Sequence, residues 1–565
     1  MDNVTLRYVG FDFPALFNFL QEVIQNSTDP LQSPYLQQGQ AGSETYLSLT
    51  HDVCLAITGS WALYEQQDIW NRIVTWKLPL LTLLFQFSRP PFAFRLWTNT
   101  NVFMLVHLVG NPINTIASLL ATLDACQRRA TEIRQRIEAH QRHSGKASPW
   151  RRTAVLWKRF TIIDVSYAEW GVANARPFLQ RSLDQLLRQP DARIAKHFSV
   201  AAAQLAADRA TYALPVVVAQ LSFVVAIGAA YWRVAGVPPQ PHAWTNVEAY
   251  SIAMSAPFLH ALPVVFLAAI VGATQTETSA PRILNALRER LVSDGWEEVL
   301  ARNDGGAGGG SMVDTIPLPR TEEIQDREED TEEQDSSGSD ELAEPAHNGT
   351  PLELGQRIAS GCLYAWRADL LAPTGANMRQ HASHMALATT FVALSVAVAQ
   401  YISYGVPPAG LDCRSGAQAA LLGAWAGMFG CDFVLACLFP NKNRLYNITF
   451  AKDAAAALAV VTLIVVTQLG IFNQCACYTA WGAAPLALPQ LPAVAKVLTT
   501  RIARDWPAAT FLWIGMELLL CVFAVGVRYR DALRVYLQRD DGSSNGGFGR
   551  LSGQTLFELG VVGQG

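Results

Sequence analysis

Four apolar segments between His384 and Arg528 constrain the fold of this chain more than any other feature. Each is about 20 residues long, and at a rise of about 1.5 Å per residue such a helix crosses the roughly 30 Å of hydrocarbon in a bilayer. They are expected at 384–404, 417–438, 454–472 and 508–527. The sequence therefore predicts a block of four transmembrane helices over 384–528, because only helices and closed barrels span a bilayer.

Further candidate spans precede this block. Two apolar runs, 212–232 and 251–273, are long enough to span, and a shorter run at 73–88 is the best candidate for a first span. Residues 102–123 contain Asn111-Pro112, and because proline removes a backbone donor we expect a broken or re-entrant element there. Seven spans place the N-terminus outside the cytosol, and an eighth span at 102–123 would place it inside.

Composition supports this assignment. Half of the residues are hydrophobic, only 16% are charged, and the mean hydropathy is +0.15. The N-terminal sequence MDNVTLRYVG has no basic segment followed by a clean apolar run, so no secretory signal peptide is expected. The predicted fold class is all-α: a polytopic helical membrane protein with seven to eight transmembrane helices, cytosolic helical segments and a disordered acidic linker.

Charge is distributed unevenly along the chain. Residues 124–211 hold sixteen Lys or Arg against eight Asp or Glu, a net +8, and basic residues near spans stay in the cytosol. Residues 321–344 hold twelve Asp or Glu against one Arg, a net −11. With its Gly-rich start, the stretch 303–353 has too little apolar surface to offset the entropy of ordering, so we expect a disordered linker there.

These observations divide the chain into nine regions. They are an N-terminal extracytosolic segment (1–72), first membrane elements (73–123), a basic cytosolic helical region (124–211), a transmembrane pair (212–273), a cytosolic amphipathic helix (274–302), the acidic linker (303–353), an interfacial helix (354–383), the four-helix block (384–528) and a cytosolic tail (529–565).

Three ionisable residues fall inside expected spans. Asp432 lies about 10 Å from the cytosolic end of its helix, while Glu517 and His260 lie near mid-depth. No Lys or Arg lies within the expected spans, so a carboxylate there must be protonated, bind a cation, or accept hydrogen bonds. The candidate donors are His260, Gln220, Gln400 and Gln468. One interpretation is a shared proton or cation site of Asp432, Glu517 and His260; the other is neutral carboxyls that hold helices together.

The segment 417–438 also carries small residues at four-residue spacing. They are Ala419, Gly423, Gly427 and Cys431. Such a line lets another helix approach closely, and we expect packing within the chain rather than dimerisation.

Cysteines and possible N-glycosylation sites occur in segments that are expected on the extracytosolic side. Cys413 falls in one expected outer loop, and Cys475 and Cys477 fall in another, so a disulfide from Cys413 to Cys475 or Cys477 is predicted in an oxidising lumen. Asn3 and Asn26 are predicted glycosylation acceptors if the N-terminus is outside the cytosol. Three thiols without a nearby His give no established metal-site spacing, and no metal or other cofactor is predicted.

Partners follow from the charged regions. The basic helices of 124–211 are suited to anionic lipids of the bilayer, and the acidic linker is a candidate for protein partners. Nucleic-acid binding is not expected, because the basic residues are interleaved with acids and tethered at a membrane. No nucleotide, hydrolase or zinc-protease motif appears in a fitting context, so a third function, a membrane-embedded enzyme, has no motif behind it.

Three stretches resemble polytopic integral membrane proteins of filamentous fungi. They are ALYEQQDIWNRIVTWKLPLLTLLFQFSRPP, VHLVGNPINTIASLL and LGIFNQCACYT. The resemblance implies a fungal integral membrane protein and brings no activity, substrate or site residue with it.

Two functions remain open on the sequence. The first is a transporter- or channel-like protein with an intramembrane carboxylate site. The second is a non-catalytic membrane scaffold that recruits partners through its cytosolic helices and acidic linker.

Overall fold

The structure is a computed structural model. It describes residues 36–41, 44–49, 78–85, 106–144, 150–169, 175–188, 191–210, 213–236, 252–271, 273–274, 279–296, 378–405, 413–439, 442–468, 472, 486–487 and 504–536. The expected linker, most of the expected interfacial helix 354–383 and most of the C-terminal tail lie outside these residues, and residues 378–383 are the start of α17.

The chain divides into two compact units. Unit 1 comprises residues 1–125, 211–273 and 327–529, and unit 2 comprises residues 126–210, 274–326 and 530–565. Each is described by itself below.

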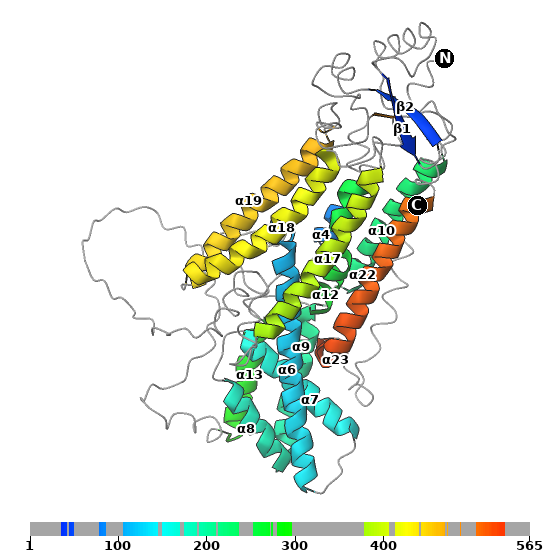
Figure 1. Ribbon diagram of the computed structural model, residues 1–565. Coiled ribbons are helices and arrows are strands. Elements are labelled where there is room, and N and C mark those ends of the chain that lie inside the picture. Colours follow the sequence, from blue (N-terminus) through cyan, green and yellow to red (C-terminus); the bar gives the residue numbers. More distant parts are fainter. Residues whose placement is uncertain are drawn as a thin grey trace, which may run out of the picture. The chain divides into compact units, whose positions relative to one another are not determined.

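Unit 1 is built from long apolar helices (Figure 1). Their bounds are α4 (Leu78–Phe85), the first part of α6 (Pro112–Ser144), α10 (Ala213–Gly236), α12 (Ala261–Val271), α17 (Met378–Gly405), α18 (Cys413–Leu438), α19 (Lys442–Gln468) and α22 (Trp506–Arg528). Helix α18 packs against both α17 and α19, and α22 contacts α17 and α12. In Figure 1, α18 and α19 are the yellow and orange neighbours.

Five helices of the described chain are long and apolar enough to cross a membrane, which indicates a multi-pass membrane protein. They are Pro215–Trp232, Ile252–Ala269, Ala382–Gly405, Ile448–Thr467 and Trp506–Arg528. Helix α18 also has the length of a span, although it is not among the five. The described part of the expected first span 73–88 is the eight residues of α4.

The segment 252–271 holds the most deeply buried of the five candidate spans, because 94% of the residues from Ile252 to Ala269 are inside the protein. A helix that is apolar on all sides is typical of a bundle centre. The α-helix gives way to a short 3₁₀ turn at η4 (Ala256–Phe258), which contains Pro257, and the segment continues as α12. Proline lacks the backbone N–H that an α-helical hydrogen bond needs, which accounts for the 3₁₀ turn.

A small sheet adds to the helices of unit 1. Strands β1 (Leu36–Ala41) and β2 (Glu44–Leu49) form an antiparallel hairpin, and β2 also pairs with β5 (Leu486–Ala487) through Ser48↔Ala487 and Leu49↔Leu486. A second, two-stranded sheet consists of β3 (Arg209–Ala210) and β4 (Ala273–Thr274). The all-α expectation is therefore right for the helical body and omitted these short strands.

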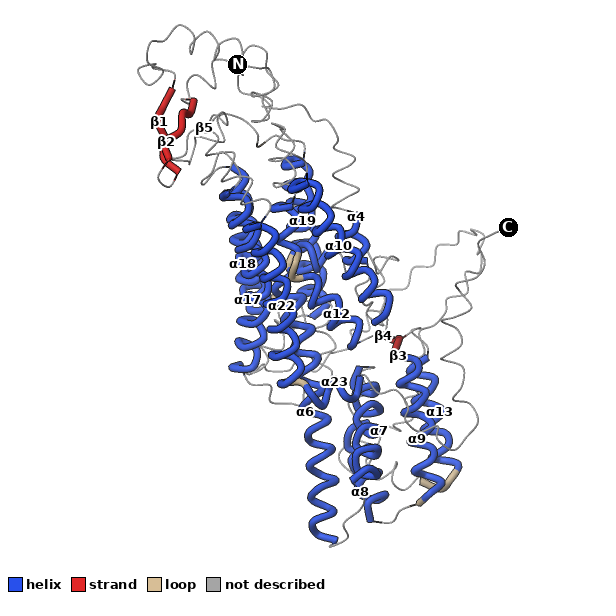
Figure 2. Tube along the Cα trace, turned by 90° about the vertical axis from the view of Figure 1, so that its right-hand side faces the viewer, coloured by secondary structure: helices blue, strands red, loops and turns tan. Residues whose placement is uncertain are grey.

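Unit 2 is a bundle of shorter amphipathic helices, seen in Figure 2 around the labels α7, α8, α9 and α13. It contains the rest of α6, α7 (Trp150–Glu169), α8 (Ala175–Arg188), α9 (Ala192–Asp208), α13 (Ser279–Ser293) and α23 (Arg530–Tyr536). Phe160 of α7 stacks on Phe198 of α9 with ring centroids 4.6 Å apart. Tyr167 donates to the Leu284 carbonyl at 3.4 Å, and burial raises the pKa of its hydroxyl.

Candidate functional site

The site begins where Pro112 interrupts a helix. Residues 106–110 are helical, Asn111 is not, and α6 starts at Pro112. The Asn111 N–H still bonds to the His107 carbonyl at 2.9 Å, and the Thr115 hydroxyl donates to the His107 and Asn111 carbonyls. The threonine hydroxyl thus adds a donor to one carbonyl before the interruption and to one at it.

One face of this interrupted helix is polar. His107, Gly110, Asn111 and Asn114 are spaced at i, i+3, i+4 and i+7, so they lie on the same side. All four are buried, and His107 and Asn111 have no exposed surface. That face meets Asp432 of α18 and Asp453 of α19.

Helix α19 starts earlier than the sequence predicted, and this corrects the expectation that no basic residue lies within a span. The sequence assigned 440–453 to a loop, whereas α19 begins at Lys442 and already holds Lys452 and Asp453 as helical residues. Lys452 is only 13% exposed, and Nζ lies 2.9 Å from Asp432 Oδ1 and 2.6 Å from Asp453 Oδ1. Asp432 therefore has a cationic partner.

We call His107, Asn111, Asn114, Asp432, Lys452 and Asp453 the ionic cluster. Asp432 Oδ2 accepts hydrogen bonds from Asn111 Nδ2 at 2.6 Å and from Asn114 Nδ2 at 2.8 Å. Asp453 Oδ2 lies 2.6 Å from His107 Nδ1. Lys452 Nζ also lies 3.4 Å from the Met428 carbonyl, so each of its three N–H groups has an acceptor nearby.

Charge in the ionic cluster balances only when one further proton or cation is bound. Two aspartates and one lysine sum to −1, and a proton on His107 would bring the sum to zero. A charge taken out of water must be paired to be tolerated. With both aspartates ionised, the cluster therefore carries a formal charge of −1, and one added positive charge makes it neutral.

A glycine permits the close approach on which the cluster depends. A Cβ added at Gly110 would lie 2.1 Å from the Asp453 carbonyl oxygen and 3.1 Å from the Ala457 nitrogen. Both are backbone atoms of α19, which cannot move away as a side-chain end can. Gly110 therefore brings the backbone that carries His107 and Asn111 against α19.

Glu517 and His260, the other two predicted site residues, have partners outside the ionic cluster. Ser395 of α17 donates to Glu517 Oε1 at 2.6 Å, and Glu517 is 1% exposed. His260 Nδ1 lies 2.8 Å from the Pro257 carbonyl, and its ring meets Trp425 of α18 edge-on with centroids 5.9 Å apart. Direct contacts therefore do not join Asp432, Glu517 and His260 into one site in the described chain. Gln220 and Gln400 donate to the Leu262 and Ser415 carbonyls rather than to a carboxylate, and Gln468 has no described side chain.

The line of small residues on α18 is not used for packing within the described chain. Ala419, Gly423, Gly427 and Cys431 are all exposed, and a Cβ at Gly423 or Gly427 would meet no described atom within 4 Å. The expectation of intramolecular packing is therefore wrong for these residues. The opposite face of α18 is the buried one, and it carries Gln418, Trp425 and Asp432.

Cys413 is disulfide-bonded, and Cys431 and Cys521 are free. Cys475 and Cys477 lie outside the described residues, as do Asn3 and Asn26, so the predicted pairing and glycosylation remain predictions. In the described part of the chain, no group of three or more His, Cys, Asp or Glu side chains is placed to hold a metal ion.

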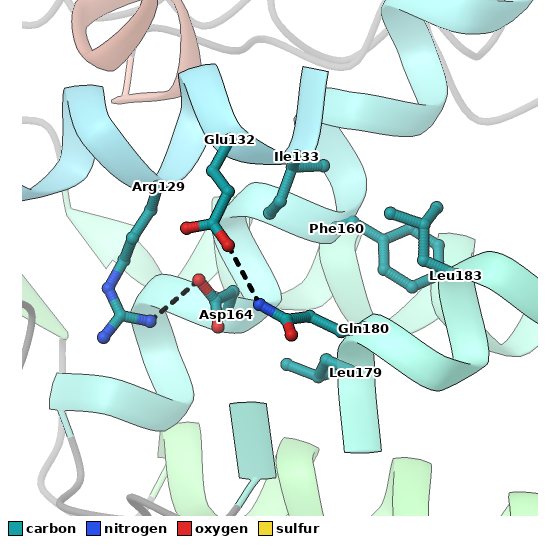
Figure 3. Close-up of a pocket in the computed structure, with 8 residues that line it drawn as sticks. All are labelled: Arg129, Glu132, Ile133, Phe160, Asp164, Leu179, Gln180 and Leu183. Atoms are coloured by element: carbon teal, nitrogen blue, oxygen red, sulfur yellow. Dashed lines mark hydrogen bonds and ion pairs between the residues drawn. The ribbon is translucent and has the colours of Figure 1, made fainter. Parts of the chain in front are cut away.

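Unit 2 has a small pocket of its own, drawn in Figure 3. Arg129 and Asp164 form a buried ion pair at 2.8 Å, and Gln180 donates to Glu132 at 3.1 Å. The apolar lining residues are Ile133, Phe160, Leu179 and Leu183. Because its polar groups are bonded to one another, this pocket is a weaker candidate for ligand chemistry than the ionic cluster.

Comparisons with protein-family models, with curated proteins and with solved structures find no match to the chain.

Proposed function

We propose that the chain is a transporter- or channel-like multi-pass membrane protein whose ionic cluster binds a proton or a cation. The observation that carries the proposal is the uneven charge of a buried network: Asp432, Asp453 and Lys452 sum to −1, and His107 sits 2.6 Å from Asp453. Ionisable groups inside membrane helices are costly, and ion and proton pathways are among the roles that retain them.

The cluster is also positioned to couple ion binding to helix movement. Its members come from three separate elements: the interrupted helix at 106–114, α18 and α19. Non-helical backbone at membrane depth, such as Asn111, is tolerated where it is buried in protein or borders a binding site. A change of one charge would alter hydrogen bonds on all three elements at once.

A second candidate is a non-catalytic membrane scaffold. It is favoured by the completeness of the bonding: the Asp432 carboxylate receives two asparagine amides and a lysine, as a purely structural clamp would. In that case the cluster fixes the helices, and the protein acts through its cytosolic helices and acidic linker, with anionic lipid or protein partners.

For the topology we propose seven spans with the N-terminus outside the cytosol. Strand β2 pairs with β5, which belongs to the expected outer loop 473–507, so the N-terminal hairpin shares the side of that loop. An odd number of crossings must then separate the hairpin from the cytosolic region 124–211. Asn111 and Asn114 bond to Asp432, which lies about 10 Å from the cytosolic end of α18, so the chain has crossed most of the bilayer by Asn111 and we assign the single crossing to residues 78–114. With α18 and the five candidate spans this makes seven.

Ion flux in a reconstituted system tests the function. Purified protein is placed in liposomes that contain a pH-sensitive dye, and a potassium diffusion potential drives protons. We expect flux above that of empty liposomes, and a loss of at least about tenfold for Asp432→Asn. Flux equal to empty liposomes across several imposed cation gradients, for wild type and variant alike, would favour the scaffold.

A further inference from the structure

The buried face of α18 continues beyond the ionic cluster. Gln418, Trp425 and Asp432 follow one another at seven-residue spacing, so they lie on one side of the helix, about 10 Å apart. All three are at most 3% exposed. This face packs against the segment 252–260, where Gln418 donates to the Ala253 carbonyl at 3.2 Å and Trp425 contacts Phe258 and His260.

Two acceptor atoms on this face have no partner among the described residues. A carbonyl oxygen can only accept, so His260 Nδ1 carries the proton in its 2.8 Å bond to Pro257, and Nε2 of the neutral ring carries a lone pair. That Nε2 makes no hydrogen bond to a described atom, and neither does Gln418 Oε1. His260 is 1% exposed and Gln418 is fully buried. A buried acceptor without a donor is costly, so both atoms are suited to a ligand that brings donors.

The chemistry of the lining selects the kind of ligand. Alkali and alkaline-earth ions prefer several oxygen ligands, whereas this face offers one amide oxygen and, about 10 Å further along, one imidazole nitrogen among aromatic rings. A cation with N–H donors fits better, because each N–H can donate to Nε2 or Oε1 and because the face of an indole such as Trp425 attracts cations. Trp425 in turn donates from Nε1 to the Val109 carbonyl at 3.0 Å, two residues before Asn111 of the ionic cluster.

We propose that Gln418, and then His260 with Trp425, are two successive binding positions for ammonium or a small protonated amine, which lead along α18 to the ionic cluster. The proposal rests on the proposed function, since the cluster with its net charge of −1 is the point to which the cation moves. Gln418 Oε1 accepts a hydrogen bond from the cation at the first position, and His260 Nε2 accepts one at the second, beside Trp425 and about 10 Å further along α18. Asp432, two helical turns past Trp425, lies at the third.

Uptake of radiolabelled methylammonium into proteoliposomes tests this site. We expect wild-type uptake well above that of empty liposomes, and a loss of at least about tenfold in His260→Leu and in Gln418→Leu, which lack the acceptors. His260→Gln keeps an acceptor and should retain uptake within about threefold. Gln220→Leu is the matched control, because it removes the same kind of amide-to-carbonyl bond at Leu262, away from this face.

The outcomes separate this inference from the proposed function. Uptake unchanged in both Leu variants would overturn the inference, and so would an absence of methylammonium uptake. Proton flux that still depends on Asp432 would then leave the proposed function standing. If the Leu variants do not fold, the melting temperature of the wild type decides: it should rise in ammonium chloride relative to sodium chloride at equal ionic strength, and equal values would contradict the site.

Discussion

His107 Nδ1 lies 2.6 Å from Asp453 Oδ2, and neither side chain has exposed surface. The contact joins residues 346 positions apart and ties the interrupted helix at 106–111 to α19. Asp453 also accepts from Lys452, which bonds to Asp432 as well. The state of one imidazole is therefore linked through Asp453 and Lys452 to the carboxylate on α18.

Gly110 should be the position least tolerant of an added methyl group in this part of the fold. Gly110→Ala places a Cβ 2.1 Å from the Asp453 carbonyl, so the backbones must separate, at a cost of about 1–3 kcal/mol. We expect a clearly lower melting temperature in detergent. Gly423→Ala is the control, because nothing lies within 4 Å and alanine is the better helix former, so its melting temperature should be unchanged or slightly higher. Equal effects of the two substitutions would contradict the close approach.

Lys452 should stabilise the folded protein only while its carboxylate partners are charged. Lys452→Met leaves Asp432 and Asp453 without their shared cation in a buried setting, which should destabilise the protein by about 3–5 kcal/mol. Adding Asp432→Asn removes one of the two uncompensated charges, so the double variant should be more stable than Lys452→Met alone. The measurement is a double-mutant cycle of unfolding free energies at neutral pH. Strictly additive effects would contradict the ion pair.

Glycosylation tests the proposed seven-span topology. With the N-terminus outside the cytosol, Asn3 and Asn26 enter the secretory lumen and should carry glycans when the chain is expressed in a eukaryotic host. Treatment with a deglycosylating enzyme should then shift the protein on a gel, and Asn3→Gln with Asn26→Gln should abolish the shift. Asn348, in the triplet NGT of the acidic linker, should stay unmodified because that linker is expected in the cytosol. Modification of Asn348 with no modification of Asn3 and Asn26 would reverse the assignment.

Within unit 2, α6 should hold the start of α23. Gln127 Oε1 accepts from the backbone N–H groups of Asp531 and Ala532 at 2.9 Å, and Arg134 Nη1 lies 2.8 Å from Asp531 Oδ2. Unsatisfied donors at a helix start are stabilised by such a cap, worth about 0.5–2 kcal/mol. Gln127→Ala should therefore speed hydrogen exchange of the amides in 530–536.

Arg142→Ala is the control for this cap. Arg142 is 81% exposed and only 3.8 Å from Glu138, a surface pair of little energetic value. Its removal should leave exchange in α23 unchanged. If hydrogen exchange in α23 is equally fast in the wild type and in Gln127→Ala, the cap is contradicted.

Long apolar runs with sharp ends could be predicted well. Helices α10, α17 and α22 match the expected spans 212–232, 384–404 and 508–527 closely, because hydrocarbon thickness sets their length. The start of α19 could not be predicted from hydropathy. Its first turns contain Lys, Arg, Asn and Asp, which were assigned to a loop, whereas a helix needs only backbone hydrogen bonds and accepts charges that face partners.

The ionic cluster was missed except for Asp432. A signal was present in the i, i+3, i+4, i+7 spacing of His107, Gly110, Asn111 and Asn114, which marks one polar helix face. Its partner could not be found, because Asp453 is more than 300 residues away and periodicity within one helix says nothing about which other helix it meets. The prediction that the small residues of α18 pack within the chain was wrong for a related reason. Their spacing shows that they share one face of the helix, but it does not show whether another helix covers that face.

Potential-driven proton flux through His107→Gln, set against wild type, tests the central claim most directly. The glutamine amide can donate to Asp453 but takes up no proton at neutral pH, so the cluster keeps its hydrogen bond and loses one charge state. At equal protein density and with a melting temperature within a few degrees of wild type, we predict a loss of flux of at least about tenfold. The contradicting result has two parts: wild-type protein gives more flux than empty liposomes, and that flux is unchanged in His107→Gln and in Asp453→Asn. Such a result would contradict a proton- or cation-binding role for the cluster.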